Sequence, residues 1–86
     1  MVQLLHQRHT MPKIKQLSAG AIHVFSNDHP PPHFHVRAND GKSVKLHIPT
    51  LRVLVGAVDP KLRKEAEVWA AANMKLLQAK WKQLNP

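Results

Sequence analysis

Two short stretches in the middle of the chain alternate strictly between polar and apolar residues, as strands with one buried face do. They are residues 33–38 and 43–48, and the turn-forming residues Asn39, Asp40 and Gly41 lie between them. The alternation therefore predicts a β-hairpin. Its apolar face consists of Phe34, Val36, Ala38, Val44, Leu46 and Ile48.

The register of this hairpin follows from the rule that directly paired residues lie on the same face of a sheet. A two-residue turn would pair Phe34 with a histidine and mix the two faces. A three-residue turn, with Gly41 at positive φ in a G1 bulge, pairs Phe34 with Leu46 instead. We predict this second register, which also pairs His33 with His47 and His35 with Lys45.

Other segments rich in β-branched and aromatic residues predict further strands. Residues 21–26 (AIHVFS) are expected to form a strand before the hairpin, and residues 51–55 a short strand or crossing segment after it. A short extended piece is expected around Ile14. The prediction is an antiparallel sheet of three or four strands.

The chain from Asp59 to Leu84 is dominated by Ala, Leu, Lys, Glu and Gln, which favour helices. Asp59 suits the N-cap position and Pro60 the first helical position. The segment can form one long helix, or two with a break near Asn73. We therefore predict an α+β fold in which this segment covers one face of the sheet. The predicted apolar stripe is Leu62, Ala66, Trp69, Asn73, Leu76, Leu77 and Leu84.

The composition indicates one small basic domain. The chain has 86 residues, with 13 Lys and Arg against 5 Asp and Glu, and this excess favours a polyanionic partner, RNA more than DNA. Residues 11–86 are predicted to form the domain and residues 1–10 a disordered extension, because Met11 begins a second plausible start. A core of this size favours association with a partner protein or a homodimer.

The absence of cysteine excludes disulfides and thiolate chemistry. The apolar runs are too short for a membrane span, and the first residues lack the features of a signal peptide. We therefore expect a cytoplasmic protein that does not enter a membrane.

A proline-rich segment brings three histidines close together in the sequence. His29, His33 and His35 fall within seven residues, and residues 30–32 between them are all proline. The prolines predict an extended, polyproline-like approach to the hairpin. The spacing of two then places His33 and His35 on the same face of a strand.

The polar face of the predicted sheet is expected to be open to solvent, and several kinds of chemistry are compatible with it. Its members are His33, His35, Arg37, Lys45 and His47, with His23 joining them if Ile22 and Val24 face the core. Three imidazoles in one patch could hold zinc, nickel or copper. The cations beside them would repel an ion, however, and Asp28 is the only carboxylate close in sequence. No metal site and no cofactor is predicted.

A second interpretation is RNA cleavage without a metal. This chemistry needs a base for the 2′-hydroxyl, an acid for the leaving oxygen and a cation for the charged intermediate. His33 and His35, with His47 opposite, are the candidate catalytic residues, and Arg37 and Lys45 would supply the positive charge.

A third interpretation is phosphate binding without catalysis. The candidate binding residues are Arg37, Lys45, His29 and His23, and Phe25 could stack on a base if it lies on this face. A fourth is purely structural, in which the histidines only order the proline loop.

Residues 25–36 (FSNDHPPPHFHV), after MPKI at 11–14, resemble the small prokaryotic family known as domain-of-unknown-function family 4160. Gly56, the Asp59–Pro60 helix start and Trp69 with Trp81 extend the resemblance over about residues 11–84. Members often carry a histidine about four residues after the first Trp, where this chain has Asn73.

The resemblance implies a place in a two-gene module. Members are often encoded beside a second small protein, of domain-of-unknown-function family 2442, in an arrangement similar to toxin–antitoxin pairs. The basic, histidine-bearing chain would be the toxin-like half, with the second protein as its cognate partner. We therefore predict a component of a toxin–antitoxin-like module that binds nucleic acid or a partner protein through its His/Arg/Lys face, with metal-independent RNA cleavage as an enzymatic extension. The alternative is a histidine-rich metal-binding or protein-interaction domain without catalysis.

Overall fold

A computed structural model describes residues 13–86 as an α+β fold, which confirms the predicted fold class. The expected extension, residues 1–10, lies outside the described residues. The strands are β1 (Lys13–Gln16), β2 (Gly20–His23), β3 (His33–Ala38), β4 (Ser43–His47) and β5 (Val53–Gly56), and the helices are α2 (Pro60–Ala72) and α3 (Met74–Leu84).

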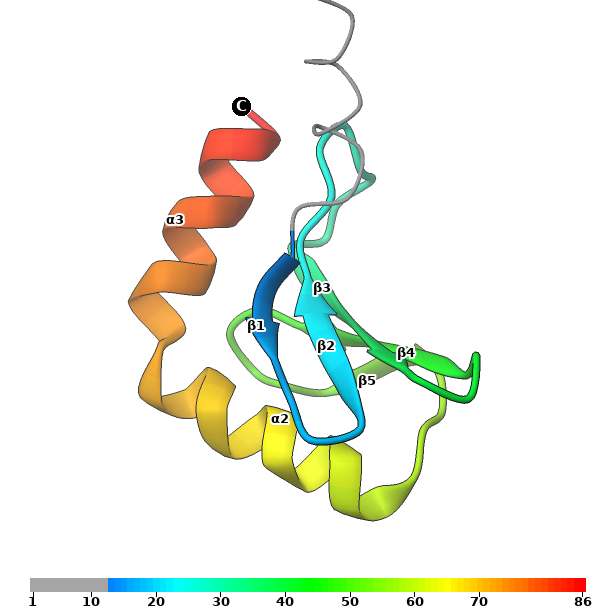
Figure 1. Ribbon diagram of the computed structural model, residues 1–86. Coiled ribbons are helices and arrows are strands. Elements are labelled where there is room, and N and C mark those ends of the chain that lie inside the picture. The colour runs from blue at the N-terminus through cyan, green and yellow to red at the C-terminus, as the bar shows by residue number, and fades with distance from the viewer. Residues whose placement is uncertain (1–12) are drawn as a thin grey trace, which may run out of the picture.

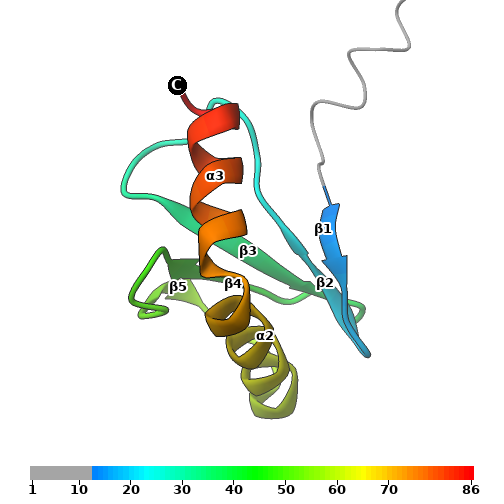
Figure 2. The same ribbon diagram turned by 90° about the vertical axis from the view of Figure 1, so that its left-hand side faces the viewer.

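The strands form one antiparallel sheet in the order β1-β2-β3-β4-β5, so that each strand pairs with its neighbours in sequence. The sheet has five strands rather than three or four, because the extended piece around Ile14 pairs with β2 as strand β1. Both helices lie on the same side of the sheet (Figures 1 and 2). Strand β3, which carries the His-x-His sequence, is the central strand.

The register of the β3–β4 hairpin is the predicted one. Phe34 pairs with Leu46, and the polar face pairs His33 with His47 and His35 with Lys45. Gly41 has a φ of 95° and its amide donates to the Ala38 carbonyl at 3.0 Å, which closes the three-residue turn. The alternation of polar and apolar residues was sufficient to fix this part of the fold.

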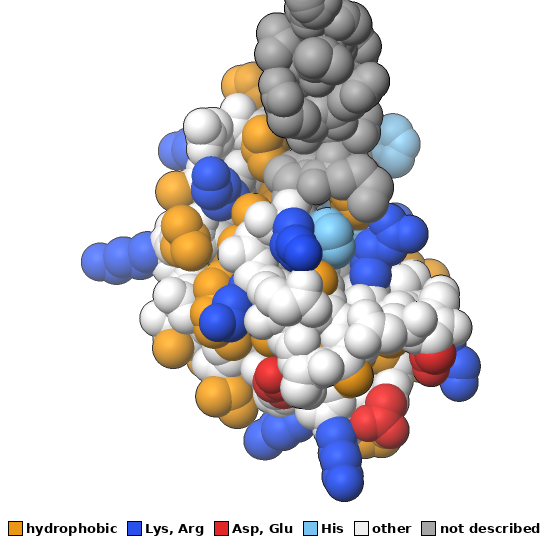
Figure 3. Space-filling model, in the orientation of Figure 1, with side chains coloured by type: hydrophobic (Ala, Val, Ile, Leu, Met, Phe, Trp, Pro, Cys, Tyr) orange, Lys and Arg blue, Asp and Glu red, His pale blue; other side chains and the backbone are white. Residues whose placement is uncertain are grey.

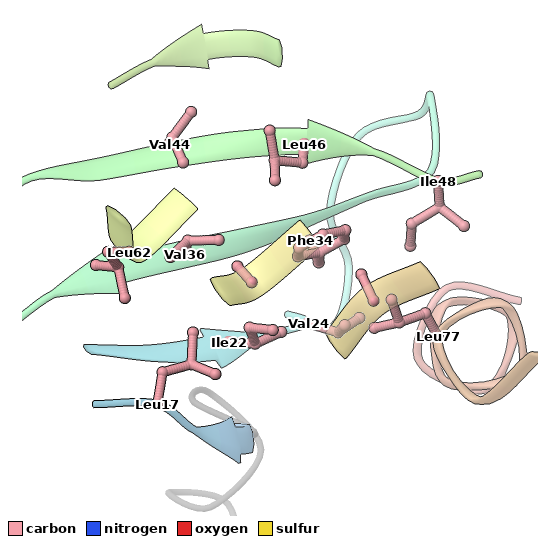
Figure 4. Close-up of a cluster of buried hydrophobic side chains, with 12 residues drawn as sticks. Leu17, Ile22, Val24, Phe34, Val36, Val44, Leu46, Ile48, Leu62 and Leu77 are labelled. Carbon is pink, nitrogen blue, oxygen red and sulfur yellow. The ribbon is translucent and has the colours of Figure 1, made fainter. Parts of the chain in front are cut away.

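The core lies between the apolar face of the sheet and the two helices. Phe34 is its largest fully buried side chain, with Leu46 and Val36 from the hairpin and Leu77 from α3 around it (Figure 4). The other fully buried large side chains are Ile22, Val24 and Val44.

The helical segment is broken at Asn73, which was one of the two predicted arrangements. The Asn73 side chain donates to the carbonyl oxygen of Trp69 at 2.9 Å and caps the end of α2. A new helix begins at Met74, so the helical spacing does not continue across the break. For this reason Leu76, which the predicted stripe included, is 41% exposed, whereas Ala70 is fully buried.

The start of α2 is as predicted. Asp59 is the N-cap and its carboxylate accepts from the Lys61 amide at 3.0 Å, and Pro60 is the first helical residue. Within residues 13–86, neither helix is long and apolar enough to cross a membrane.

Two glycines with positive φ provide a matched test of backbone packing. Gly56 has a φ of 90°, and a Cβ there would collide with the Ser43 backbone; Gly41 has a similar φ of 95° but open space around it. We expect Gly56→Ala to destabilise the fold by more than Gly41→Ala, which should cost about 1 kcal/mol for the backbone conformation alone. Urea unfolding of both variants measures the difference. Equal losses of folding stability would show that β4 and β5 can move apart at little energetic cost.

Candidate functional site

The loop between β2 and β3 forms the frame of the candidate site. Asn27 takes a left-handed conformation with a φ of 54°, which turns the chain sharply before Asp28. The Pro30–Pro31 peptide bond is cis.

The sharp turn brings the Asp28 carboxylate against both histidines of β3. Its Oδ2 atom lies 2.9 Å from His33 Nε2 and 3.2 Å from His35 Nε2. Asp28 was not among the predicted site residues. The available signal was that it is the only carboxylate close in sequence to these histidines.

The other ring nitrogen of His33 shows where this imidazole carries a hydrogen. His33 Nδ1 lies 2.8 Å from the Pro31 carbonyl oxygen, which can only accept. Nδ1 is therefore protonated and donates to Pro31. In the neutral ring, the lone pair of Nε2 then points at Asp28, so a hydrogen or a metal ion is needed between the two groups.

Aromatic rings pack around the histidines and bury them. The Trp81 ring lies 5.1 Å from that of His33, and Phe25 meets His35 edge-on at 4.5 Å and stacks on His23 at 5.7 Å. His33 is 3% exposed and His23 8% exposed. The expectation of a solvent-open face is thus wrong at these two positions, because the proline loop and α3 fold over His33 and Phe25 covers His23.

The C-terminal end of α3 holds the loop in place. Asn85 Oδ1 accepts from the Asp28 amide at 2.6 Å, and Asn85 Nδ2 donates to the Phe25 carbonyl at 3.1 Å. The Asn27 amide donates to the Leu84 carbonyl at 3.3 Å. These contacts span almost the whole described chain, and no local sequence pattern indicates them.

The electrostatics of the cluster follow from burial and from the neighbouring charges. Burial lowers the pKa of His35, and His33 and Lys45 act in the same direction, so that the hydrogen bond to Asp28 offsets only part of the change. Burial lowers the pKa of His23 as well, with help from Arg37 and Lys13.

The Asp28 carboxyl behaves in the opposite way. Burial on its own would raise its pKa, but the hydrogen bonds from His35 and the His29 amide, together with the charges of the two imidazoles, hold the pKa below its usual value. The carboxylate is therefore the stable form in the cluster.

The other predicted site residues are placed around this cluster rather than in it. Lys45 pairs with His35 across the sheet and is partly buried, and Arg37 is exposed farther along β3. His47 pairs with His33, but its ring hydrogen-bonds the Thr50 hydroxyl at 2.7 Å. His29 is exposed on the loop, and its backbone amide donates to the Asp28 carboxylate at 2.9 Å.

Asn73 lies at the junction of the two helices. Its side chain is used in the break between α2 and α3. The departure from the histidine that family members often carry at this point therefore affects the helix junction rather than the Asp28 cluster.

Comparison with protein families supports the resemblance seen in the sequence. The model of the family described as "Domain of unknown function (DUF4160)" matches residues 21–82, a range that includes the whole loop, the hairpin, all of α2 and most of α3. The chain belongs to this family. Comparison with curated proteins and with solved structures finds no match.

Proposed function

We propose that this DUF4160 domain binds single-stranded RNA through the face of its sheet that carries the histidines. The observation that carries the proposal is a row of basic and imidazole side chains across the strands. Lys13 pairs with His23, His23 with His35, and His35 with Lys45, so these four residues lie side by side on one face. Arg37 lies on the same face two residues beyond His35.

The acidic residues are placed away from this row. Asp40 lies in the hairpin turn, Asp59 caps α2, and Glu65 and Glu67 are on α2. Asp28 is the exception, and its carboxylate is engaged by His33, His35 and the His29 amide. In Figure 3, Lys and Arg side chains lie on either side of an imidazole in the middle of the view, and the visible carboxylates lie in its lower part. Such a surface attracts a phosphate backbone.

The shape of the face favours a single strand of RNA over duplex DNA. A sheet surface cannot enter the major groove as a helix or a two-stranded ribbon does. Phe25 lies beside His23 and His35 and is only partly buried, which makes it the candidate side chain for stacking on a base.

The test is fluorescence anisotropy with a labelled single-stranded RNA over a range of salt concentrations. If Lys13, Arg37 and Lys45 each contact one phosphate, the slope of log affinity against log salt concentration should be about −2, since each contact contributes about −0.7. The double variant Arg37→Gln/Lys45→Gln should bind roughly tenfold more weakly or worse at low salt, with a slope smaller by about 1.4.

The double variant Lys64→Gln/Lys75→Gln is the matched control, because it removes the same charge from the helices. It should keep most of the affinity. Equal losses in the two double variants would show that only net charge matters, and no binding of RNA at low salt by the wild-type protein would overturn the proposal.

We propose binding rather than cleavage because His33 is buried and both of its ring nitrogens are engaged. The same samples, run on a denaturing gel in chelator, test this choice. We expect intact RNA. Cleavage that disappears in both His33→Ala and His35→Ala would instead assign acid–base catalysis to this face.

The toxin–antitoxin-like setting is the other part of the proposal. Its support is the resemblance and the basic charge of the chain, which suits the toxin-like half. A small cognate partner protein and a homodimer are its predicted assemblies.

A further inference from the structure

We propose that Asp28, His33 and His35 bind one divalent transition-metal ion, through Asp28 Oδ2 and the Nε2 atoms of both histidines. The three side chains each present one ligand atom, and no two of these atoms are farther apart than 4.8 Å. This inference does not depend on RNA binding.

The spacing of the ligand atoms is close to what an ion between them needs. Tetrahedral nitrogen and oxygen ligands at about 2.0–2.2 Å from zinc lie about 3.3–3.6 Å from each other. The two distances from Asp28 Oδ2, 2.9 Å to His33 and 3.2 Å to His35, are slightly shorter, so the carboxylate has to move only a little to admit the ion. The arrangement differs from the histidine-only site considered from the sequence, because the carboxylate supplies a negative charge.

The outer contact of His33 is the kind that orients a metal ligand. A histidine that binds a metal through one ring nitrogen usually donates from the other to a carbonyl or carboxylate. His33 donates from Nδ1 to the Pro31 carbonyl, so its Nε2 atom faces Asp28 Oδ2. A cation between these two atoms would take the place of the hydrogen that otherwise has to lie there.

The surroundings hold the three groups in place before any ion arrives. His33 and His35 are fixed on the central strand, and the Trp81 and Phe25 rings pack against them. The backbone of Asp28 is held by Asn85. Such preorganisation lowers the cost of bringing ligands together.

The site is accessible from one side. The Asp28 side chain is 21% exposed, and a cavity of about 220 Å³ is lined by Asp28, His33, Lys45 and the first prolines of the loop. The cavity leaves room for water or an anion to complete the coordination. Two imidazoles and one carboxylate suit zinc and similar first-row ions better than magnesium or calcium, which prefer oxygen.

The experiment is calorimetric titration of the full-length, chelator-stripped protein with zinc chloride alone. We expect saturable binding of one zinc ion per chain. His35→Gln and Asp28→Asn should each weaken binding by more than about 100-fold, because loss of even an outer partner of a ligand costs about 10–100-fold. Asp28→Asn should fold, since its amide can donate to His33 Nε2.

The control is His47→Ala, which removes a strand histidine that bonds Thr50 instead of Asp28. It should keep the wild-type affinity. His6 and His9 are present in every variant and so contribute equally. In the wild-type protein, zinc should also shift the NMR signals of the His33 and His35 ring nitrogens.

Absence of saturable zinc binding by the wild-type protein would overturn the proposal. A loss of zinc affinity in His47→Ala as large as that in His35→Gln would also overturn it, and so would an unchanged zinc affinity in Asp28→Asn. Circular dichroism of each variant in chelator shows whether its fold is retained, and the NMR shifts test the ligand assignment without any substitution.

Discussion

Phe34→Ala is expected to remove about 3–5 kcal/mol of folding stability, the usual cost of deleting a fully buried phenylalanine side chain. Phe34 is completely buried and is the largest of the fully buried side chains. It lies on the central strand, between two strands on one side and two on the other, with the helices over it. The surrounding side chains have little freedom to move into the cavity that the substitution would leave.

The expected loss in Phe34→Ala is large relative to the total folding stability of the protein. Total stability is about 0.05–0.15 kcal/mol per residue in most domains, or about 4–13 kcal/mol for a chain of this length. The variant should therefore be largely unfolded if the protein is at the lower end of that range. Urea unfolding followed by circular dichroism measures the change in midpoint and slope.

Val68→Ala is a suitable control, because Val68 is 60% exposed on α2 and its truncation should cost less than about 0.5 kcal/mol. A loss below about 1 kcal/mol in Phe34→Ala would show that the core is not organised around this residue.

Phe34 lies between His33 and His35 in sequence, so the same strand alternation that buries it also places both histidines on the opposite face.

This alternation explains why so much of the hairpin could be predicted. The pairing of Phe34 with Leu46 depends only on the polar and apolar pattern and on a turn that needs Gly41 at positive φ. Both are local properties of the sequence. The N-cap at Asp59 is local for the same reason.

The candidate site could be predicted only in part, because it depends on contacts between distant segments. The pairing of His33 with His47 and of His35 with Lys45 was predictable from the register. The approach of Asp28 depends on the left-handed Asn27 and on Asn85, which is separated from Asp28 by 57 positions. The burial of His33 under Trp81 likewise results from the direction that α3 takes after the break at Asn73.

Asp28→Ala is expected to destabilise the chelator-treated protein by about 2 kcal/mol, within the range for leaving a buried polar group without a partner. His33 is almost fully buried, and its Nδ1 hydrogen is committed to Pro31. Without residue 28 as a partner, its Nε2 atom has no group to bond in the present arrangement. Urea unfolding in the presence of chelator measures this loss.

Asp28→Asn should cost less than about 1 kcal/mol under the same conditions, because the amide can donate to the Nε2 lone pair while Nδ1 continues to donate to Pro31. Similar losses in the two variants would show that the charge of Asp28, rather than a hydrogen bond to His33, stabilises the apo cluster. A loss near zero in Asp28→Ala would show that the contact contributes nothing to folding.

Adding zinc should separate both variants from the wild-type protein without changing their order. A ligand that binds only the folded protein stabilises it by about 2.7 kcal/mol at a concentration of 100 times its Kd. The wild-type protein should gain this stability, and both Asp28 variants should gain little, because neither an amide nor a methyl group replaces the carboxylate as a metal ligand. Asp28→Asn would then stay more stable than Asp28→Ala, but both variants would lack the zinc-dependent gain of the wild type, as expected if the carboxylate is needed for a metal ion and the polar side chain for the fold.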